Sequence, residues 1–309
     1  MPATSSSRPI ENLSAAHRVT LAIQAAFERG VRPWAKPWDD TIASGPLLLP
    51  RRANGAAYRG MNVVALWAAA NEAGFTSPYW FTFKQAQALG AQVRKGERGS
   101  FVVFYKEAPA GGAAEEEREG ARTRRILRGY VVFNRAQIDK LGGAYDPPPL
   151  SPAPNPESDP HAVRFENVPA SVRFGGARAF YAPATDHVQL PPKAAFPDAT
   201  RFYATYAHEL GHWTRHPSRL DRDFGQKRFG DHGYALEELV AELCAAFVGA
   251  VIGLPADHIE DHASYIAHWL TILKNDRSLF LTAAGKAQLA ADYLLHLMGE
   301  NEAGAAPSE

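Results

Sequence analysis

Hydrophobic residues recur at helical spacing through much of the chain. In the first half this spacing predicts three helices, over residues 14–30, 62–74 and 83–90. Two runs rich in β-branched and aromatic residues, 100–105 and 126–133, predict a β-hairpin, and the charged stretch 108–125 between them predicts its long loop. Helices followed by a hairpin indicate an α+β fold for this half.

The second half has a different pattern. Residues 177–191 predict two short strands around a turn, and the hydrophobic positions beyond them are spaced as in helices. The predicted helices span residues 200–216, 234–253, 262–275 and 278–299. We therefore expect an α+β protein whose second half is mainly helical with a small β-sheet.

A proline-rich segment separates the two halves. Residues 146–160 contain seven prolines, which neither continue a helix nor donate to a β-ladder, so we interpret the segment as an extended linker. This interpretation gives a first domain over 1–145, a second over 161–299 and a flexible tail over 300–309.

Composition and charge narrow the class of protein. Hydrophobic residues make up 46% of the chain, enough for a packed core. The single cysteine allows no internal disulfide, no apolar run approaches the roughly 18 residues that span a bilayer, and the polar start lacks a secretory signal. We therefore expect a cytoplasmic protein without a membrane partner.

The formal net charge of zero conceals an asymmetry between the halves. Residues 1–145 hold 20 Lys and Arg against 12 Asp and Glu, whereas the remainder holds 13 against 21. A net charge of +8 on the first half indicates a polyanionic partner, although ordinary variation between domains is the alternative.

The stretch AHELGHW, residues 207–213, has the pattern of a metal-hydrolase site. His208 and His212 are four residues apart, so on a helix both imidazoles share one face and can hold one ion. Glu209 lies about 100° around that helix and can act as the general base on a water molecule. Gly211 allows another backbone to approach closely. The same spacing also arises by chance, so the pattern needs a third ligand.

The predicted helix 234–253 offers that ligand. It is strongly apolar, yet Glu238 and Glu242 share one face, and buried carboxylates are costly unless a cation pairs with them. We assign Glu238 as the third ligand and Glu242 as the acceptor for a ligand histidine's free N–H, with the reverse assignment left open. Tyr234, one turn before Glu238, is a second catalytic candidate. The strand over 186–191 is the candidate edge strand for a bound peptide.

The first half combines aromatic and basic residues as single-stranded nucleic acid binding requires, because bases stack on aromatic faces and cations follow phosphates. Core packing is the alternative role for the tryptophans, and a solvated turn is the alternative for residues 93–99. The candidate DNA contacts are Trp34, Lys36, Trp38, Tyr58, Arg59, Asn62, Trp80, Lys84, Gln85, Arg94, Lys95 and Arg98.

Several ordered segments carry a family resemblance. GVRPWAKPW, YRGMNVVALW, SPYWFTFKQAQALGAQVRKGERG and GYVVFNRAQIDKL resemble the N-terminal domain of ArdC-type antirestriction proteins, a domain also found in certain plasmid primases. YATYAHELGHWTRHPSRLDR and FGDHGYALEELVAELCAAF resemble the metallopeptidase domain of that family. The resemblance implies a plasmid or mobile-element protein that binds single-stranded DNA and protects incoming DNA during conjugation. It implies His208, His212 and Glu238 as ligands and Glu209 as base, with Zn²⁺, or Mn²⁺ or another divalent ion, bound.

Three functions remain open at this point. The first is a DNA-binding antirestriction protein with a competent, zinc-dependent peptidase, acting on a protein or peptide substrate. The second is a DNA-binding protein whose metal site is structural, which leaves Glu209 without a use. The third is a regulatory metalloprotease that cleaves a protein partner.

Overall fold

The protein is described by a computed structural model that covers residues 13–34, 47–109, 123–147, 159–225, 232–254 and 263–300. Most of the expected linker, 148–158, the loop 110–122 and the tail from 301 lie outside these residues. In the described part of the chain, no helix has both the length and the apolar character needed to cross a bilayer.

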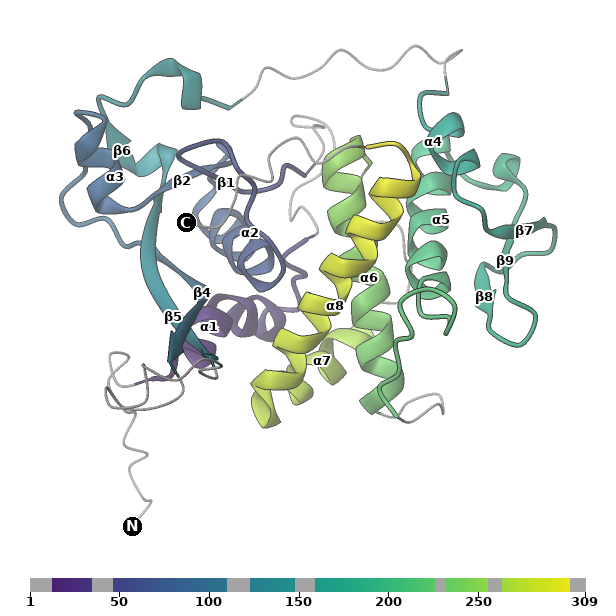
Figure 1. The fold of residues 1–309 in the computed structure, drawn as a ribbon. Helices are drawn as coiled ribbons and strands as arrows, with labels where there is room; N and C mark the ends of the chain where they lie inside the picture. Colours follow the sequence, from purple (N-terminus) through teal and green to yellow (C-terminus); the bar gives the residue numbers. More distant parts are fainter. Residues whose placement is uncertain are drawn as a thin grey trace.

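The first half has three α-helices around a sheet (Figure 1). The helices are α1 (Ala15–Glu28), α2 (Met61–Ala73) and α3 (Phe83–Ala88). The strands are β1 (Arg51–Arg52), β2 (Tyr79–Phe81), β3 (Gln92–Val93), β4 (Ser100–Pro109), β5 (Thr123–Asn134) and β6 (Ile138–Asp139). Short 3-10 helices η2 (Arg135–Gln137) and η3 (Gly143–Tyr145) flank β6.

In the described residues of the second half, five α-helices lie beside a small sheet. The helices are α4 (Ala162–Glu166), α5 (Ala199–Trp213), α6 (His232–Ile252), α7 (Ala263–Asn275) and α8 (Arg277–Leu297), with a 3-10 helix η4 (Lys193–Ala195) before α5. The strands are β7 (Ser171–Phe174), β8 (Phe180–Ala182) and β9 (His187–Leu190).

The sheets follow from local pairing. The main sheet has the order β1-β2-β5-β4, in which the predicted hairpin forms the antiparallel β4–β5 pair with Phe101 opposite Val131. β3 and β6 form a separate two-stranded pair. In the second half the order is β7-β9-β8, with β7 parallel and β8 antiparallel to β9.

The predicted α+β class and the long helices are confirmed, because their hydrophobic periodicity is strong and their ends are marked. Ser14 caps α1 by accepting a hydrogen bond from the His17 N–H at 3.2 Å, and Asp198 caps α5 through the Arg201 N–H at 2.8 Å. The strand β7 was not predicted. The interpretation of residues 186–191 as an edge strand is wrong, because β7 pairs with β9 and makes it the central strand.

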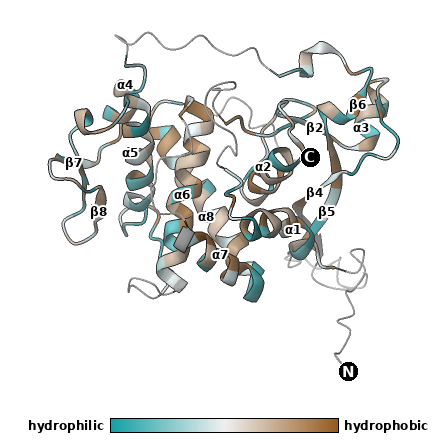
Figure 2. Cartoon of the chain, turned by 180° about the vertical axis from the view of Figure 1, so that it is seen from behind, coloured by the Kyte–Doolittle hydropathy of each residue, from teal (hydrophilic) through white to brown (hydrophobic). Residues whose placement is uncertain are grey.

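One hydrophobic core joins the two halves. Phe27 and Trp34 pack against Trp269 and Phe280, with ring centroids 5.7–6.2 Å apart. A smaller cluster that includes Phe81, Ala86 and Ile138 lies around α3. Helix α6 is buried along most of its length, and Figure 2 shows hydrophobic residues along it and its neighbours.

Candidate metal centre

Helix α5 places His208 and His212 on one face. Their ring centroids are 4.8 Å apart, as expected for residues one turn apart. Between them, Gly211 packs closely against α6, because it has no side chain: a Cβ there would lie 3.0 Å from the Ala241 Cα. The close approach expected at Gly211 is confirmed, and it brings α6 within reach of both histidines.

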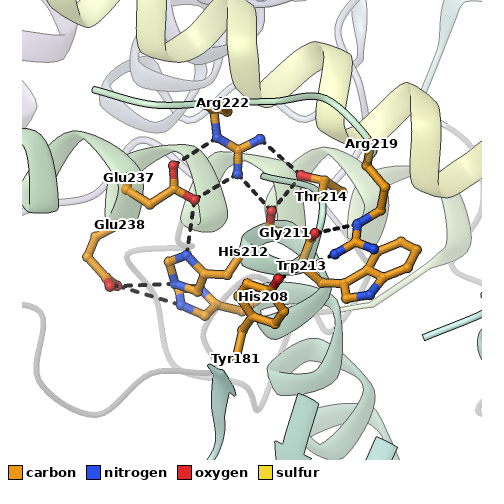
Figure 3. Close-up of polar contacts among 10 residues, drawn as sticks. All are labelled: Tyr181, His208, Gly211, His212, Trp213, Thr214, Arg219, Arg222, Glu237 and Glu238. Carbon is orange, nitrogen blue, oxygen red and sulfur yellow. Dashed lines mark hydrogen bonds and ion pairs between the residues drawn. The ribbon is translucent and has the colours of Figure 1, made fainter. Parts of the chain in front are cut away.

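Glu238 of α6 faces the two imidazoles (Figure 3). Its Oε2 lies 3.7 Å from His208 Nε2 and its Oε1 lies 3.5 Å from His212 Nε2. The three candidate ligand atoms lie within 4.8 Å of one another. Atoms that each bind an ion at about 2.0–2.2 Å lie roughly 3–4 Å apart, so two imidazole nitrogens and one carboxylate oxygen on two packed helices fit a divalent ion.

Glu209 is buried beside this cluster, with 7% of its surface exposed. Burial raises the pKa of its carboxyl to about 7, the charge of His212 opposes the rise, and Glu238 adds to it. The nearby backbone of Tyr181, in β8, favours the ionised carboxylate and also lowers this pKa. A carboxyl group that titrates near neutrality is suited to accept a proton at physiological pH.

Glu237, and not Glu242, holds the position beside a ligand histidine. Glu237 Oε1 lies 3.3 Å from His212 Nδ1. Glu242 lies four residues beyond Glu238, about 6 Å further along α6, where it accepts a hydrogen bond from Trp34 Nε1 at 3.2 Å and lies 3.7 Å from Arg32. The role expected for Glu242 is therefore corrected. Burial raises the pKa of Glu242 to about 7, against the charge of Arg32.

Arg222 explains how Glu237 is held. Its Nε and Nη2 donate to the two carboxylate oxygens of Glu237 at 2.8 and 2.7 Å. Burial alone would raise the pKa of Glu237, but the hydrogen bonds from Arg222 and His212 lower it. Sequence reasoning missed Arg222, because nothing in the local pattern distinguishes a buried arginine from an exposed one.

Tyr234 lies one turn before Glu238 and hydrogen-bonds to its carboxylate. Burial raises the pKa of the Tyr234 hydroxyl, and the charge of Glu238 raises it further, so the phenol stays a neutral donor. For Glu238, burial would raise the pKa, but the charge of His212 and hydrogen bonds from His212 and Tyr234 lower it to about 2. Glu238 is therefore an ionised carboxylate.

A cleft of about 720 Å³ opens over these residues. Phe180 and Tyr181 of β8, Arg215 after α5 and Tyr234 of α6 are among the residues that line it. Because β8 is at the edge of its sheet, its backbone is the one placed to pair with an extended peptide, in place of the strand expected from the sequence.

The aromatic DNA-binding candidates are mostly packed inside the protein. Trp34, Tyr58 and Trp80 are only 0%, 3% and 1% exposed, so the stacking role expected for them is corrected to a packing role. Lys36 and Trp38 lie outside the described residues.

Several polar candidates are engaged within the chain. Asn62 donates to the Val103 carbonyl and accepts from its N–H, at 2.7 and 2.8 Å. Gln85 completes a capping box with Thr82 at the start of α3, and Arg59 pairs with Asp292.

Besides Arg59, four basic candidates are exposed: Lys84, Arg94, Lys95 and Arg98. Of these, Arg94 donates to Glu97 Oε1 and to the Ala136 carbonyl. All four belong to the α3–β3 end of the molecule, on the far side of α2 from α5 (Figure 1). The exposed ring of Phe83, 44% exposed, starts α3 beside Lys84 and was not singled out from the sequence.

Comparison with known proteins matches each half to a family. Residues 14–133 match the N-terminal domain of the anti-restriction factor ArdC, and residues 161–286 match a zincin-like metallopeptidase family. The uncharacterised protein y4eC of Sinorhizobium fredii is 43% identical over 284 residues, which cover 90% of each chain. A DNA primase TraC of Escherichia coli is 37% identical over 289 residues, which cover 87% of this chain but only 26% of the primase.

Two crystal structures of the antirestriction protein ArdC from plasmid R388 have the same fold. The metal-free structure matches with a TM-score of 0.77 at 41% identity, and the Mn(II)-bound structure with 0.74 at 40%. Each match covers 94% of this chain and 100% of the other.

Proposed function

Since this chain belongs to the ArdC antirestriction family, with a zincin-like second half, we propose that it is a metal-dependent peptidase that also binds single-stranded DNA. The observation that carries the peptidase proposal is the convergence of His208, His212 and Glu238, with Glu209 buried beside them. A purely structural metal site has no need of a buried carboxyl next to the ligands.

The residues have distinct roles in this proposal. His208, His212 and Glu238 would hold the ion, which supplies Lewis acidity and lowers the pKa of a water molecule. Glu209 would accept a proton from a water molecule and pass it to the leaving amine, a role for which a pKa of about 7 is well matched. Tyr234 keeps Glu238 in place and is near enough to the ligands to contact the reacting carbonyl. The edge of β8 holds the peptide.

Glu209→Gln tests the peptidase proposal. The substitution removes the base and keeps the size of the side chain, so we expect bound metal to be retained and cleavage of labelled casein to fall by 10²-fold or more. The matched control is Glu166→Gln, which makes the same change on an exposed residue of α4. Unchanged cleavage in Glu209→Gln would reject Glu209 as the base.

The metal is expected to be Zn²⁺, with Mn²⁺ as the alternative that the Mn(II)-bound relative raises. Elemental analysis of the purified chain, followed by cleavage assays after chelation and re-addition of each ion, identifies the one that supports activity. A chain that takes up neither ion would contradict the peptidase proposal.

For DNA, the support is the family of the first half and its excess of basic residues. Because Trp34 and Trp80 are buried, we propose that the exposed side chains at the α3–β3 end, Lys84, Lys95 and Arg98 with the ring of Phe83, contact the strand. Binding to the strand as it enters a recipient cell would protect incoming DNA during conjugation.

Charge reversal at Lys95 and Arg98 tests this surface. For single strands, each lost phosphate contact reduces the slope of log binding constant against log salt concentration by about 0.7. The double variant Lys95→Glu/Arg98→Glu should therefore bind a labelled 20-nucleotide strand more weakly, with a slope smaller by about 1.4. The control is Arg173→Glu, on exposed β7. An unchanged slope in the double variant would place the DNA elsewhere.

A further inference from the structure

The chain folds back on α5 immediately after the metal-binding turn. The Leu220 N–H donates to the Thr214 carbonyl and the Arg222 N–H donates to the Arg215 carbonyl, both at 3.1 Å. This turn places Arg219 and Arg222 at different sides of the end of α5 (Figure 3). Both guanidinium groups are nearly sealed from solvent, with side-chain exposures of 7% and 1%.

Arg222 connects three backbone or side-chain groups of the site. It donates to both oxygens of Glu237, to Thr214 Oγ1 at 3.0 Å and to the Gly211 carbonyl at 2.9 Å. A planar guanidinium that donates to both oxygens of a carboxylate fixes its orientation as well as its position, which an ammonium group does not.

The orientation of Glu237 matters because of what it contacts next. Its Oε1 faces His212 Nδ1 at 3.3 Å, while His212 Nε2 faces Glu238. An acceptor at Nδ1 keeps the proton on that nitrogen and leaves Nε2 with its lone pair toward the ligand cluster. Glu237 can do this only if its carboxylate stays in one rotamer, and the bidentate contact from Arg222 holds that rotamer.

We infer that Arg222 is a positioning residue for the metal centre: through Glu237 it sets the tautomer and orientation of His212, and so the affinity for the ion. The inference rests on the proposed metal site. The turn after α5 contributes no ligand, but through Arg222 it would affect how tightly the ion is bound.

The alternative is that Arg222 only fastens the turn to the helix. That role predicts a less stable protein whose metal affinity is unchanged once it is folded. Arg219 provides the matched comparison, because it fastens the same turn by contacts that do not involve Glu237. It donates to the Trp213 carbonyl at 2.7 Å, its guanidinium carbon lies 3.9 Å from the centroid of the Trp213 ring, and it pairs with Asp186.

The test is a titration of the full chain with Mn²⁺, in which binding is measured as the loss of the electron paramagnetic resonance signal of the free ion. A parallel competition titration uses Zn²⁺. Arg222→Lys keeps the charge but loses the bidentate contact. The double variant Arg222→Met/Glu237→Leu removes the acceptor while replacing a buried ion pair by apolar groups of similar volume, a change that often preserves folding. Arg219→Gln is the control, and each variant's Tm is measured in the absence of metal.

We expect affinity to fall about 10–100-fold in the double variant, to an intermediate extent in Arg222→Lys, and not at all in Arg219→Gln even where its Tm drops. Equal affinity in the wild type, Arg222→Lys and the double variant would overturn the inference. An equal loss in Arg219→Gln would also overturn it, because the effect would then be general loosening of the turn. A wild type that binds neither ion would overturn the proposed function itself, and this inference with it.

Discussion

Gly211 lies between His208 and His212 on α5, where it packs closely against Ala241 of α6. A methyl group at this position would meet the Ala241 Cα at 3.0 Å and its carbonyl oxygen at 3.3 Å. Both atoms belong to the backbone of a buried helix, so they cannot rotate away as a side chain would. The missing side chain at Gly211 therefore sets the distance between the helix that carries His212 and the helix that carries Glu238.

Gly211→Ala should destabilise the protein, although alanine is the better helix former. The propensity gain of about 1 kcal/mol is opposed by an overpacking cost of about 1–3 kcal/mol, and the forced separation of the helices should also weaken metal binding. Gly285→Ala in α8 is the control, because a Cβ there meets nothing within 4 Å and should stabilise by up to about 1 kcal/mol. Denaturant unfolding measures both. If Gly211→Ala were more stable than the wild type, α6 would have to shift to accommodate the added methyl group.

Single residues differed in how far the sequence could place them. His208, His212 and Glu238 were grouped correctly by helical spacing and by the cost of a carboxylate on an apolar helix. The role of acceptor beside a ligand histidine was given to Glu242, whereas Glu237 lies beside His212. The difference depends on where Trp34 and Arg222 lie, which helical spacing does not show. Burial of Trp34 and Trp80 was likewise undetermined, because the same ring suits a core and a base stack.

At the scale of elements, the β8–β9 turn is tied to the end of α5 by one ion pair. Asp186 adopts a positive φ of 46° in this turn, accepts a hydrogen bond from Tyr181 OH at 2.8 Å and pairs with Arg219. The pair therefore fixes the β8–β9 turn against the end of α5.

This ion pair predicts a loss of stability in acid. The hydrogen bonds from Arg219, chiefly, and Tyr181 lower the pKa of the Asp186 carboxyl below its ordinary value, against the effect of burial. A carboxyl whose pKa is lower when folded stabilises the protein fully above its unfolded pKa, and the contribution is lost as the pH falls through the folded pKa. Asp186→Asn, which tolerates the positive φ, should be less stable at pH 7 but lose less stability than the wild type between about pH 4 and pH 2.

Parallel pH series of denaturant unfolding measure this difference, with Asp198→Asn, at the exposed cap of α5, as a comparison for loss of a carboxylate elsewhere. Identical pH dependence in the wild type and Asp186→Asn would show that the pair adds nothing to folding.

Elements with a strong period were predictable, whereas the short, exposed strand β7 was not. The helices α5 to α8 and the hairpin β4–β5 follow the pattern of the sequence closely. The strand β7 reads Ser-Val-Arg-Phe and is mostly exposed, so it lacks the alternation of a half-buried strand. Missing it led to the wrong assignment of β9 as the edge, because strand order depends on every member of the sheet.

At the scale of the whole molecule, the two halves share their largest core. Phe27 and Trp34, from the first half, lie among Trp269 and Phe280 of α7 and α8. Trp67 of α2 also lies 5.7 Å from Phe247 of α6, ring centre to ring centre. The sequence predicts two domains joined by a linker, and its composition could not reveal this contact, because apolar helix faces look alike whether they pack within a domain or between two.

The shared core predicts that the halves unfold together. Trp34→Ala should cost roughly 3–5 kcal/mol, and far-ultraviolet circular dichroism and tryptophan fluorescence should report one common transition. Leu289→Ala, at a side chain that is 55% exposed on α8, should change stability by less than about 0.5 kcal/mol. Two separate transitions, with the second half unaffected by Trp34→Ala, would contradict this expectation.

The contact between Trp34 and Glu242 limits how the coding regions of the two halves can be recombined with other genes. A gene rearrangement that separated the coding regions of the two halves would leave α7 and α8 with apolar faces open to water. It would also leave the Glu242 carboxylate of α6 without its indole donor. Fusion of this protein to a larger polypeptide should therefore preserve its fold only when both halves are transferred together. The match to the primase is of this kind, because one continuous match includes both halves.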